Sequence, residues 1–391
     1  MSISKRRIFS LLKRNYSDYF FLLIILCVGQ IITTQLFSLS FGPIQGGDSF
    51  LSLAEKFPDL SATEWSYGGY VSILYLGSLL GSSEWFTFFL QMAVVFAASK
   101  ALLTMGRQLD GEMVGWLAAS IYLCHPMVAQ WNRYLLTDSL FYAFIVLSAS
   151  ELIRIMKKDS LSYKKIFLYL LVIATLRPNG IVFVATVALI ALTYTASTKI
   201  KKSLSVGLVV TLFLLVALFS PTLNSGNELN NFGPQAWNGV VVHGVEEERI
   251  DMPQPDNFDP SNKAFLVYIA KNPLSMLELG TKRVWWELKQ VRPWYSKNLN
   301  NFLKISMTIF YVTSAIGFWV SRKETTTKVV TGITIPFVIL IGATWAIWEG
   351  RFAWWFLSLW TLWSAKGSKI LFSGLPRFNL HNKNEKKAIC K

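Results

Sequence analysis

Charged residues, cysteine and histidine are all scarce in this sequence. Of its 391 residues only 16% are charged, and there are 3 cysteines and 3 histidines. Two cysteines lie in apolar runs and the third in the C-terminal tail, so they indicate neither a disulfide framework nor a thiolate metal cluster. The histidines are too scattered along the chain for a metal site. We therefore predict no metal site from these residue types.

The sequence also lacks the common nucleotide-binding and hydrolase motifs. It has no glycine-rich phosphate loop, no nucleotide-binding signature and no Ser-His-Asp arrangement. A membrane enzyme with this sequence would therefore have to take a substrate that is activated elsewhere.

Apolar residues, by contrast, are abundant. The chain is 52% hydrophobic and 15% aromatic, with a mean hydropathy of +0.40, which is not typical of a soluble protein. Residues 19–41 form an apolar run of about 20 residues, enough to cross a hydrocarbon core of roughly 30 Å. The run is too long for a removable signal peptide and lacks its small-residue cleavage site. We predict an all-α polytopic membrane protein that retains this first helix.

The basic residues that give the net charge of +15 lie between the apolar runs. This distribution argues against a nucleic-acid partner. Short loops rich in lysine and arginine stay on the cytoplasmic side of a membrane, and all the basic clusters of this chain can lie there at once. They are near residues 5–14, 154–165, 199–202, 322–328 and 366–391. We predict a multi-pass protein of the plasma (inner) membrane with both termini in the cytoplasm.

About ten apolar runs fit this topology. The predicted spans are residues 19–41, 84–106, 113–130, 136–155, 164–176, 180–198, 204–222, 303–320, 329–348 and 352–366. Residues 67–80 are apolar but short, which is more typical of a re-entrant or interfacial helix. Arg177-Pro178 should end the run before it, because proline removes a backbone donor and disfavours helix at the preceding residue. We place this break near the outer face.

We divide the chain into three parts. Residues 1–222 form an N-terminal transmembrane module with the first outer loop, residues 223–301 an extracytoplasmic loop, and residues 302–391 C-terminal transmembrane helices with a basic cytoplasmic tail. The first half of the long loop is predicted to be solvated and irregular, or a cover over a site. The second half interleaves cations with aromatic residues, which is typical of a helix at the lipid headgroups. We expect this second half either to anchor the chain at the membrane or to bind a lipid phosphate. Its cations are Lys282, Arg283, Lys289 and Arg292, which lie among Trp285, Trp286, Trp294 and Tyr295.

Six charged residues lie close to the ends of apolar runs, all on the predicted outer side. They are Asp48, Arg133, Asp138, Arg177, Glu349 and Arg351. Ionisable groups at membrane depth are costly unless they face water, a partner or a ligand, so this pattern indicates a site. Arginine presents a planar fork of donors that stays charged, which suits it to binding a phosphate. Two arginines opposite a carboxylate therefore favour a phosphate site.

Structural interpretations of the same residues stay open at this point. Asp48 could cap the short helix predicted to follow it, and either Thr137 or Asp138 could cap the span after them. Arg133 could anchor at the interface or pair with Asp138, and Glu349 could be the partner of Arg351. A cap and a general base are not exclusive, because a capping carboxylate remains ionised and accessible.

Several short motifs occur in an order that resembles a known superfamily. They are Gly-Asp with Leu-x-Leu-Ala at 47–54, the segment 67–81, Arg-Tyr-Leu-Leu-Thr-Asp-Ser-Leu at 133–140, Leu-Arg-Pro-Asn-Gly at 176–180, Asn-Pro-Leu at 272–274 and Glu-Gly-Arg-Phe at 349–352. Their order and sidedness resemble the GT-C superfamily of integral-membrane glycosyltransferases, in the branch of the protein O-mannosyltransferases and the lipid A aminoarabinose transferase. The resemblance covers the first two hundred residues well and the rest loosely.

The resemblance implies a GT-C-type transmembrane helix bundle with outer juxtamembrane helices. It also implies a donor sugar on a polyprenyl phosphate, made on the cytoplasmic side and used on the outer side, with inversion at the sugar. The acid of the first outer loop, Asp48, would activate the acceptor hydroxyl as a general base, while the leaving phosphate needs only cations. The residues predicted to bind the phosphate are Arg177 and Arg351, with Arg133 as a further candidate. Asp138 and Glu349 are predicted to support the site or bind substrate.

The predicted function is the transfer of a monosaccharide to an extracytoplasmic glycan, lipid or protein. The chain departs from the family pattern at Ser49 and Phe50, where a second acid and a nearby tyrosine are frequent. Asp48 is therefore expected to act alone, and a divalent cation is the disfavoured alternative to a site without cofactors. Two other functions stay open: a polymerase or ligase of lipid-linked oligosaccharides, and a flippase. Charges at outer helix ends and the lack of an internal repeat favour the transferase over transport.

Overall fold

The described part of the chain is almost entirely helical. The computed structural model describes residues 3–39, 42–44, 49–61, 64–157, 162–194, 232–243, 245, 248–255, 258–259, 262–344, 346–347 and 349–373. Among these residues the strands are two residues long, β1 (Val242–His243) and β2 (Ala346–Ile347). The predicted all-α membrane fold is confirmed.

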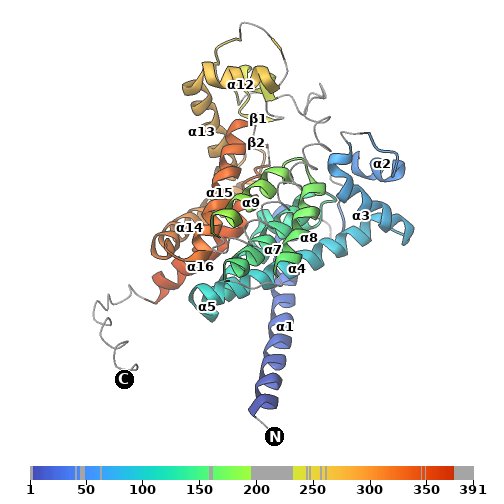
Figure 1. Ribbon diagram of the computed structural model, residues 1–391, viewed down its shortest axis with the longest axis vertical. Coiled ribbons are helices and arrows are strands. Elements are labelled where there is room, and N and C mark those ends of the chain that lie inside the picture. The colour runs from blue at the N-terminus through green and yellow to red at the C-terminus, as the bar shows by residue number, and fades with distance from the viewer. Residues whose placement is uncertain are drawn as a thin grey trace.

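The helices pack around one large apolar core (Figure 1). In chain order they are α1 (Ile3–Phe37), α2 (Ser49–Lys56), η1 (Glu64–Tyr67), α3 (Gly68–Leu79), α4 (Ser83–Asp110), α5 (Glu112–Cys124), α6 (Pro126–Ala129), η2 (Gln130–Asn132), α7 (Asp138–Met156), α8 (Ser162–Leu176), α9 (Gly180–Tyr194), α14 (Lys297–Ser321), α15 (Thr325–Ala343) and α16 (Trp354–Phe372). The last helix, α16, is buried along most of its length and packs on α14, α5 and α7. It therefore brings the C-terminal part of the chain into the middle of the N-terminal module.

Five helices of the described chain are long and apolar enough to cross a membrane. They are Tyr16–Phe37 of α1 and the helices α4, α7, α14 and α15. The predicted short spans 113–130, 164–176 and 180–198 correspond to the shorter helices α5, α8 and α9, and the doubtful run 67–80 contains the short helix α3. The predicted span 204–222 lies outside the described residues.

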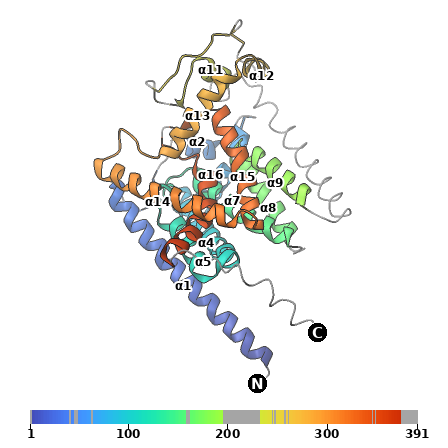
Figure 2. The same cartoon turned by 90° about the vertical axis from the view of Figure 1, so that its left-hand side faces the viewer.

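The described residues between 232 and 296, called the lobe below, lie at the top of Figure 1 and Figure 2. The lobe contains α11 (Phe232–Trp237), β1, α12 (Asn262–Lys271) and α13 (Pro273–Lys289). It has an apolar core of its own, to which Trp237, Phe265 and Leu279 contribute together with Ala346 of β2. Because β1 and β2 pair in parallel, with Val242 opposite Ala346, the lobe is joined to the segment between α15 and α16.

Two cations predicted to lie at the lipid headgroups are buried in the lobe instead. Arg283 is fully buried and donates to the carbonyls of Val240 and Gly342 at 2.8–3.1 Å. Arg292 is also fully buried and donates to the carbonyl of Trp286 at 3.0 Å. The predicted headgroup role is therefore wrong for both, because each guanidinium satisfies backbone oxygens inside the protein.

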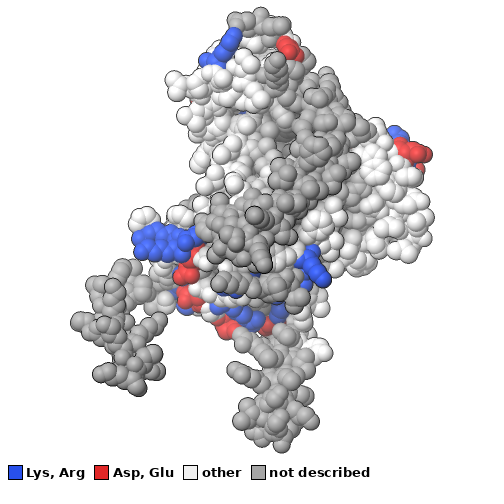
Figure 3. Space-filling model, in the orientation of Figure 1, with Lys and Arg blue, Asp and Glu red and all other residues white. Residues whose placement is uncertain are grey.

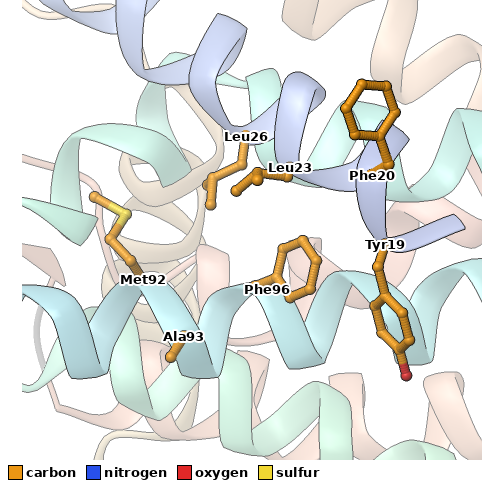
Figure 4. A pocket seen from close by; sticks show the side chains of 7 residues that line it. All are labelled: Tyr19, Phe20, Leu23, Leu26, Met92, Ala93 and Phe96. Carbon is orange, nitrogen blue, oxygen red and sulfur yellow. The ribbon is translucent and has the colours of Figure 1, made fainter. Parts of the chain in front are cut away.

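Charged side chains of the described residues gather in a few places on the face that Figure 3 shows. They appear at the top of the lobe, beside α2 and in a low band across the bundle. An apolar pocket of about 450 Å³ opens between α1 and α4 (Figure 4), lined by Tyr19, Phe20, Leu23, Leu26, Met92, Ala93 and Phe96. Because both helices are candidate membrane spans and this lining is apolar, the pocket has the composition of a surface that faces lipid chains.

Candidate functional site

Asp138 is the centre of a buried ion cluster. It is the first residue of α7, and its side chain is 1% exposed. Arg177 donates to one of its carboxylate oxygens, and Nη1 of Arg351 lies 3.1 Å from the other. Thr137 occupies the position before the helix and makes no capping bond with its side chain. Asp138 is thus held by two arginines, which answers the open question of its partner: it is Arg177 and Arg351, not Arg133.

Arg177 reaches this cluster from the predicted helix break. Helix α8 ends at Leu176, before Arg177-Pro178, and α9 begins at Gly180. The backbone of Gly180 lies so close to Ile173 that a Cβ at this position would stand 2.1 Å from the Ile173 carbonyl oxygen. The break therefore needs glycine here for the two helices to remain in contact while Arg177 turns inward.

Aromatic rings surround the two guanidinium groups. That of Arg177 lies 5.3 Å from the ring centroid of Phe352 and 5.4 Å from that of Trp355. That of Arg351 lies 5.4 Å from the ring centroid of Trp131. Aromatic faces attract cations and also exclude water, so they favour the positive charge of the arginines and strengthen electrostatic interactions at the site.

Arg351 and Glu349 lie in the segment that follows β2. Nε of Arg351 is 3.5 Å from a carboxylate oxygen of Glu349, and the hydroxyl of Tyr142 in α7 donates to the Arg351 carbonyl at 2.8 Å. Burial raises the pKa of Glu349 to about 7, although the nearby guanidinium of Arg351 opposes this shift. Glu349 can therefore change its protonation state near neutral pH.

The raised pKa of Glu349 predicts a pH-dependent stability. A carboxyl group whose pKa is higher in the folded state than in the unfolded state stabilises the fold most at low pH, and this contribution is lost as the pH rises through the folded pKa. Between pH 5 and pH 8 the wild-type protein should therefore lose up to about 3 kcal/mol relative to Glu349→Gln. Thermal unfolding of both proteins in lipid nanodiscs over this pH range checks the prediction; parallel curves would contradict it.

Several buried donors around the arginines have no hydrogen-bond partner within the described part of the chain. They are the indole N–H groups of Trp131 and Trp355, together with Nε of Arg351, which is ion-paired with Glu349 at 3.5 Å but makes no hydrogen bond. Nearly all buried polar groups in folded proteins are paired. Unpaired donors beside two arginines that share one carboxylate therefore indicate a place for an anion rich in acceptor oxygens.

Arg133 lies beside α1. It is 1% exposed, and its guanidinium donates to the side-chain oxygen of Gln30 at 3.0 Å, to the Gln30 carbonyl at 2.7 Å and to Thr34. Its own carbonyl accepts the backbone N–H of Ile44 at 2.8 Å, so the chain after α1 is attached to the segment that leads into α7. Asp48 lies outside the described residues.

Of the six predicted residues, the structure thus gathers Asp138, Arg177, Glu349 and Arg351. It also adds Tyr142 and Trp355, which could not be selected from the sequence, because an aromatic residue in an apolar helix carries no local sign of a polar contact. The part of the chain that the structure describes holds no group of three or more His, Cys, Asp or Glu side chains that could bind a metal ion.

Residues 71–224 match the family model described as dolichyl-phosphate-mannose-protein mannosyltransferase. The match supports a membrane glycosyltransferase of the GT-C superfamily. It includes Arg133, Asp138 and Arg177 and ends before the segment that carries Glu349 and Arg351. No curated protein matches the chain. The matched part and the C-terminal part of the chain meet at Asp138, because Arg351 pairs with it across 213 residues of sequence.

Proposed function

We propose that this glycosyltransferase transfers a monosaccharide from a polyprenyl-phosphate donor to an extracytoplasmic glycan, lipid or protein. The observation that carries the proposal is the pair of arginines on Asp138, with unpaired donors beside them among the described residues. The two guanidinium groups face Asp138 and Glu349, and they leave an excess positive charge when Glu349, whose pKa burial raises to about 7, is protonated. A phosphate group is the anion that fits planar, persistent cations and additional N–H donors.

In the proposed reaction the acceptor hydroxyl attacks the anomeric carbon and the sugar–phosphate bond breaks with inversion. Arg177 and Arg351 stabilise the charge that develops on the leaving polyprenyl phosphate, which needs no acid because phosphate is already a good leaving group. Asp48 accepts the proton of the acceptor hydroxyl. Arg133, bonded to α1, holds that helix and the start of the first outer loop beside the site.

We place this site on the outer face of the plasma (inner) membrane, with both termini in the cytoplasm. The positive-inside rule supports this orientation, because the basic residues Arg154 and Lys157 lie at the end of α7 opposite to Asp138. The reaction as proposed uses no cofactor.

The test is transfer of labelled sugar from synthetic polyprenyl-phosphate monosaccharides by the purified protein in lipid nanodiscs. We expect Asp48→Asn to lower kcat by about 10²- to 10⁴-fold, the usual contribution of a general base, while donor binding survives. Asp59→Asn is the matched control, because Asp59 is an exposed acid in the same outer loop.

Equal activity of Asp48→Asn and Asp59→Asn would remove Asp48 from the reaction. If the wild-type protein turned over none of the donors but bound a longer lipid-linked oligosaccharide tightly, the transferase proposal would give way to a polymerase, ligase or flippase.

A further inference from the structure

A buried acid of the lobe binds the segment that carries Arg351 on both sides. Glu287 lies in α13 and is fully buried. One of its carboxylate oxygens accepts the backbone N–H of Ile347 at 2.6 Å, and the other accepts the backbone N–H of Ala353 at 3.0 Å. The two bonds bracket Arg351, so the path of this segment depends on one carboxylate.

Gln290 adds a contact between these two. Its side chain donates to the carbonyl of Gly350 at 2.7 Å and accepts the indole N–H of Trp354 at 3.2 Å. Gly350 has a φ of +69°, and a Cβ there would lie 2.1 Å from the guanidinium of Arg292. In addition to the β1–β2 pairing, the lobe therefore holds the backbone directly before Arg351, at Gly350, and two residues after it, at Ala353.

A carboxylate is the side chain that this position requires. Burying an ionised carboxylate is costly unless hydrogen bonds and charges compensate it, and Glu287 receives two backbone N–H groups that point at separate oxygens. Glutamine could accept only one of them, because its amide nitrogen would face the other N–H. Loss of either bond frees one end of the segment.

We propose that Glu287 is a positioning residue that sets the guanidinium of Arg351 against Asp138 and the phosphate. This inference rests on the proposed function, because it assigns Arg351 to the leaving phosphate. It makes the lobe part of the active site without placing any lobe residue on the substrate. A displacement of about 1 Å at a catalytic group can cost about 10²-fold in rate, so a small shift of Arg351 has a large effect.

The experiment compares Glu287→Gln with Glu278→Gln, the same change at an exposed acid of the same helix, which pairs only with Lys282 among the described residues. We expect Glu287→Gln to lower kcat by about 10- to 100-fold with less than about a threefold change in KM for the donor, and Glu278→Gln to leave both within about twofold.

A double-mutant cycle separates positioning from general stability. If Glu287 acts through Arg351, adding Glu287→Gln to Arg351→Ala should lower the residual kcat by less than about twofold, because coupled residues are not additive. The proposal would be overturned if the double variant lost kcat by the product of the two single losses. Equal activity of Glu287→Gln and Glu278→Gln would also overturn it. Gln290→Leu, which removes the Gly350 bond, serves if Glu287→Gln does not fold, and its effect should also vanish without Arg351.

A readout that does not need turnover separates this inference from the proposed function. The Kd of the wild-type protein and of each variant for polyprenyl monophosphate should rise in Glu287→Gln and stay constant in Glu278→Gln. If no donor is turned over, the proposed function fails, but the Kd comparison still tests the role of Glu287. An unchanged Kd in Glu287→Gln would refute the positioning role.

Discussion

Replacement of Arg351 by alanine should lower kcat/KM for sugar transfer by about 10²- to 10³-fold, the usual cost of removing one donor to a developing oxyanion. Arg351 stands in aromatic surroundings and is 16% exposed, so water cannot replace its charge efficiently. Initial rates over a range of donor concentrations measure the loss. The same variant should also bind polyprenyl monophosphate more weakly, because that product carries the charge that Arg351 is proposed to stabilise.

Two further variants serve as controls for the Arg351→Ala measurement. Arg322→Ala removes an exposed arginine that lies on the ring of Trp319, and its kcat/KM should stay within about twofold of wild type. Arg351→Lys keeps the charge but loses the planar fork, so it should recover only part of the activity. Wild-type rates in Arg351→Ala would show that the phosphate is bound elsewhere.

Replacement of Asp138 by alanine should destabilise the protein by about 3–5 kcal/mol, the cost of leaving a buried ion-pair partner uncompensated. Asp138 holds two guanidinium groups inside the bundle, and its removal leaves Arg177 without its carboxylate and Arg351 with only the more distant Glu349 at 3.5 Å. Thermal unfolding in lipid nanodiscs measures the loss.

Asp110→Ala is the matched control for this stability measurement. Asp110 also pairs with a cation, Lys369 at 3.1 Å, but both side chains are about one-third exposed, so its loss should cost less than about 1 kcal/mol. Polyprenyl monophosphate should restore more stability to Asp138→Ala than to wild type, because its phosphate replaces the missing carboxylate. An equal loss in the two alanine variants would mean that the cluster is solvated.

The helices could be predicted from the sequence because they follow from apolar length and from proline. The run 164–176 ends at Arg177-Pro178 as expected, and the short apolar run at 67–80 contains a helix of 12 residues, α3. The lobe could not be predicted in the same way. Its alternation of cations and tryptophans is the pattern of an interfacial helix, and only the folded chain shows that Arg283 and Arg292 turn inward to bind backbone carbonyls.

The site could be predicted as a set of residues but not as a set of contacts. Asp138 could have been a helix cap or the partner of nearby Arg133, since both are local interactions that a sequence suggests. Its actual partners, Arg177 and Arg351, come from two other segments. The contact with Arg351 depends on how α16 is inserted into the bundle, which a local sequence pattern does not show. Glu287 carried no signal at all, because an acid within a basic helix is usually solvated.

The sharing of Asp138 by two arginines also sets an order of events during synthesis. Arg177 leaves the ribosome 39 residues after Asp138, and Arg351 only 213 residues after it. At about 5–20 residues per second, the first partner is made within about 2–8 s and the second after about 11–43 s. A nascent chain can thus form the Asp138–Arg177 pair while most of the later helices are still being inserted. Arg351 and Glu349 join this pair only once the segment between α15 and α16 has been made, so the complete cluster is among the last contacts of the described chain to form.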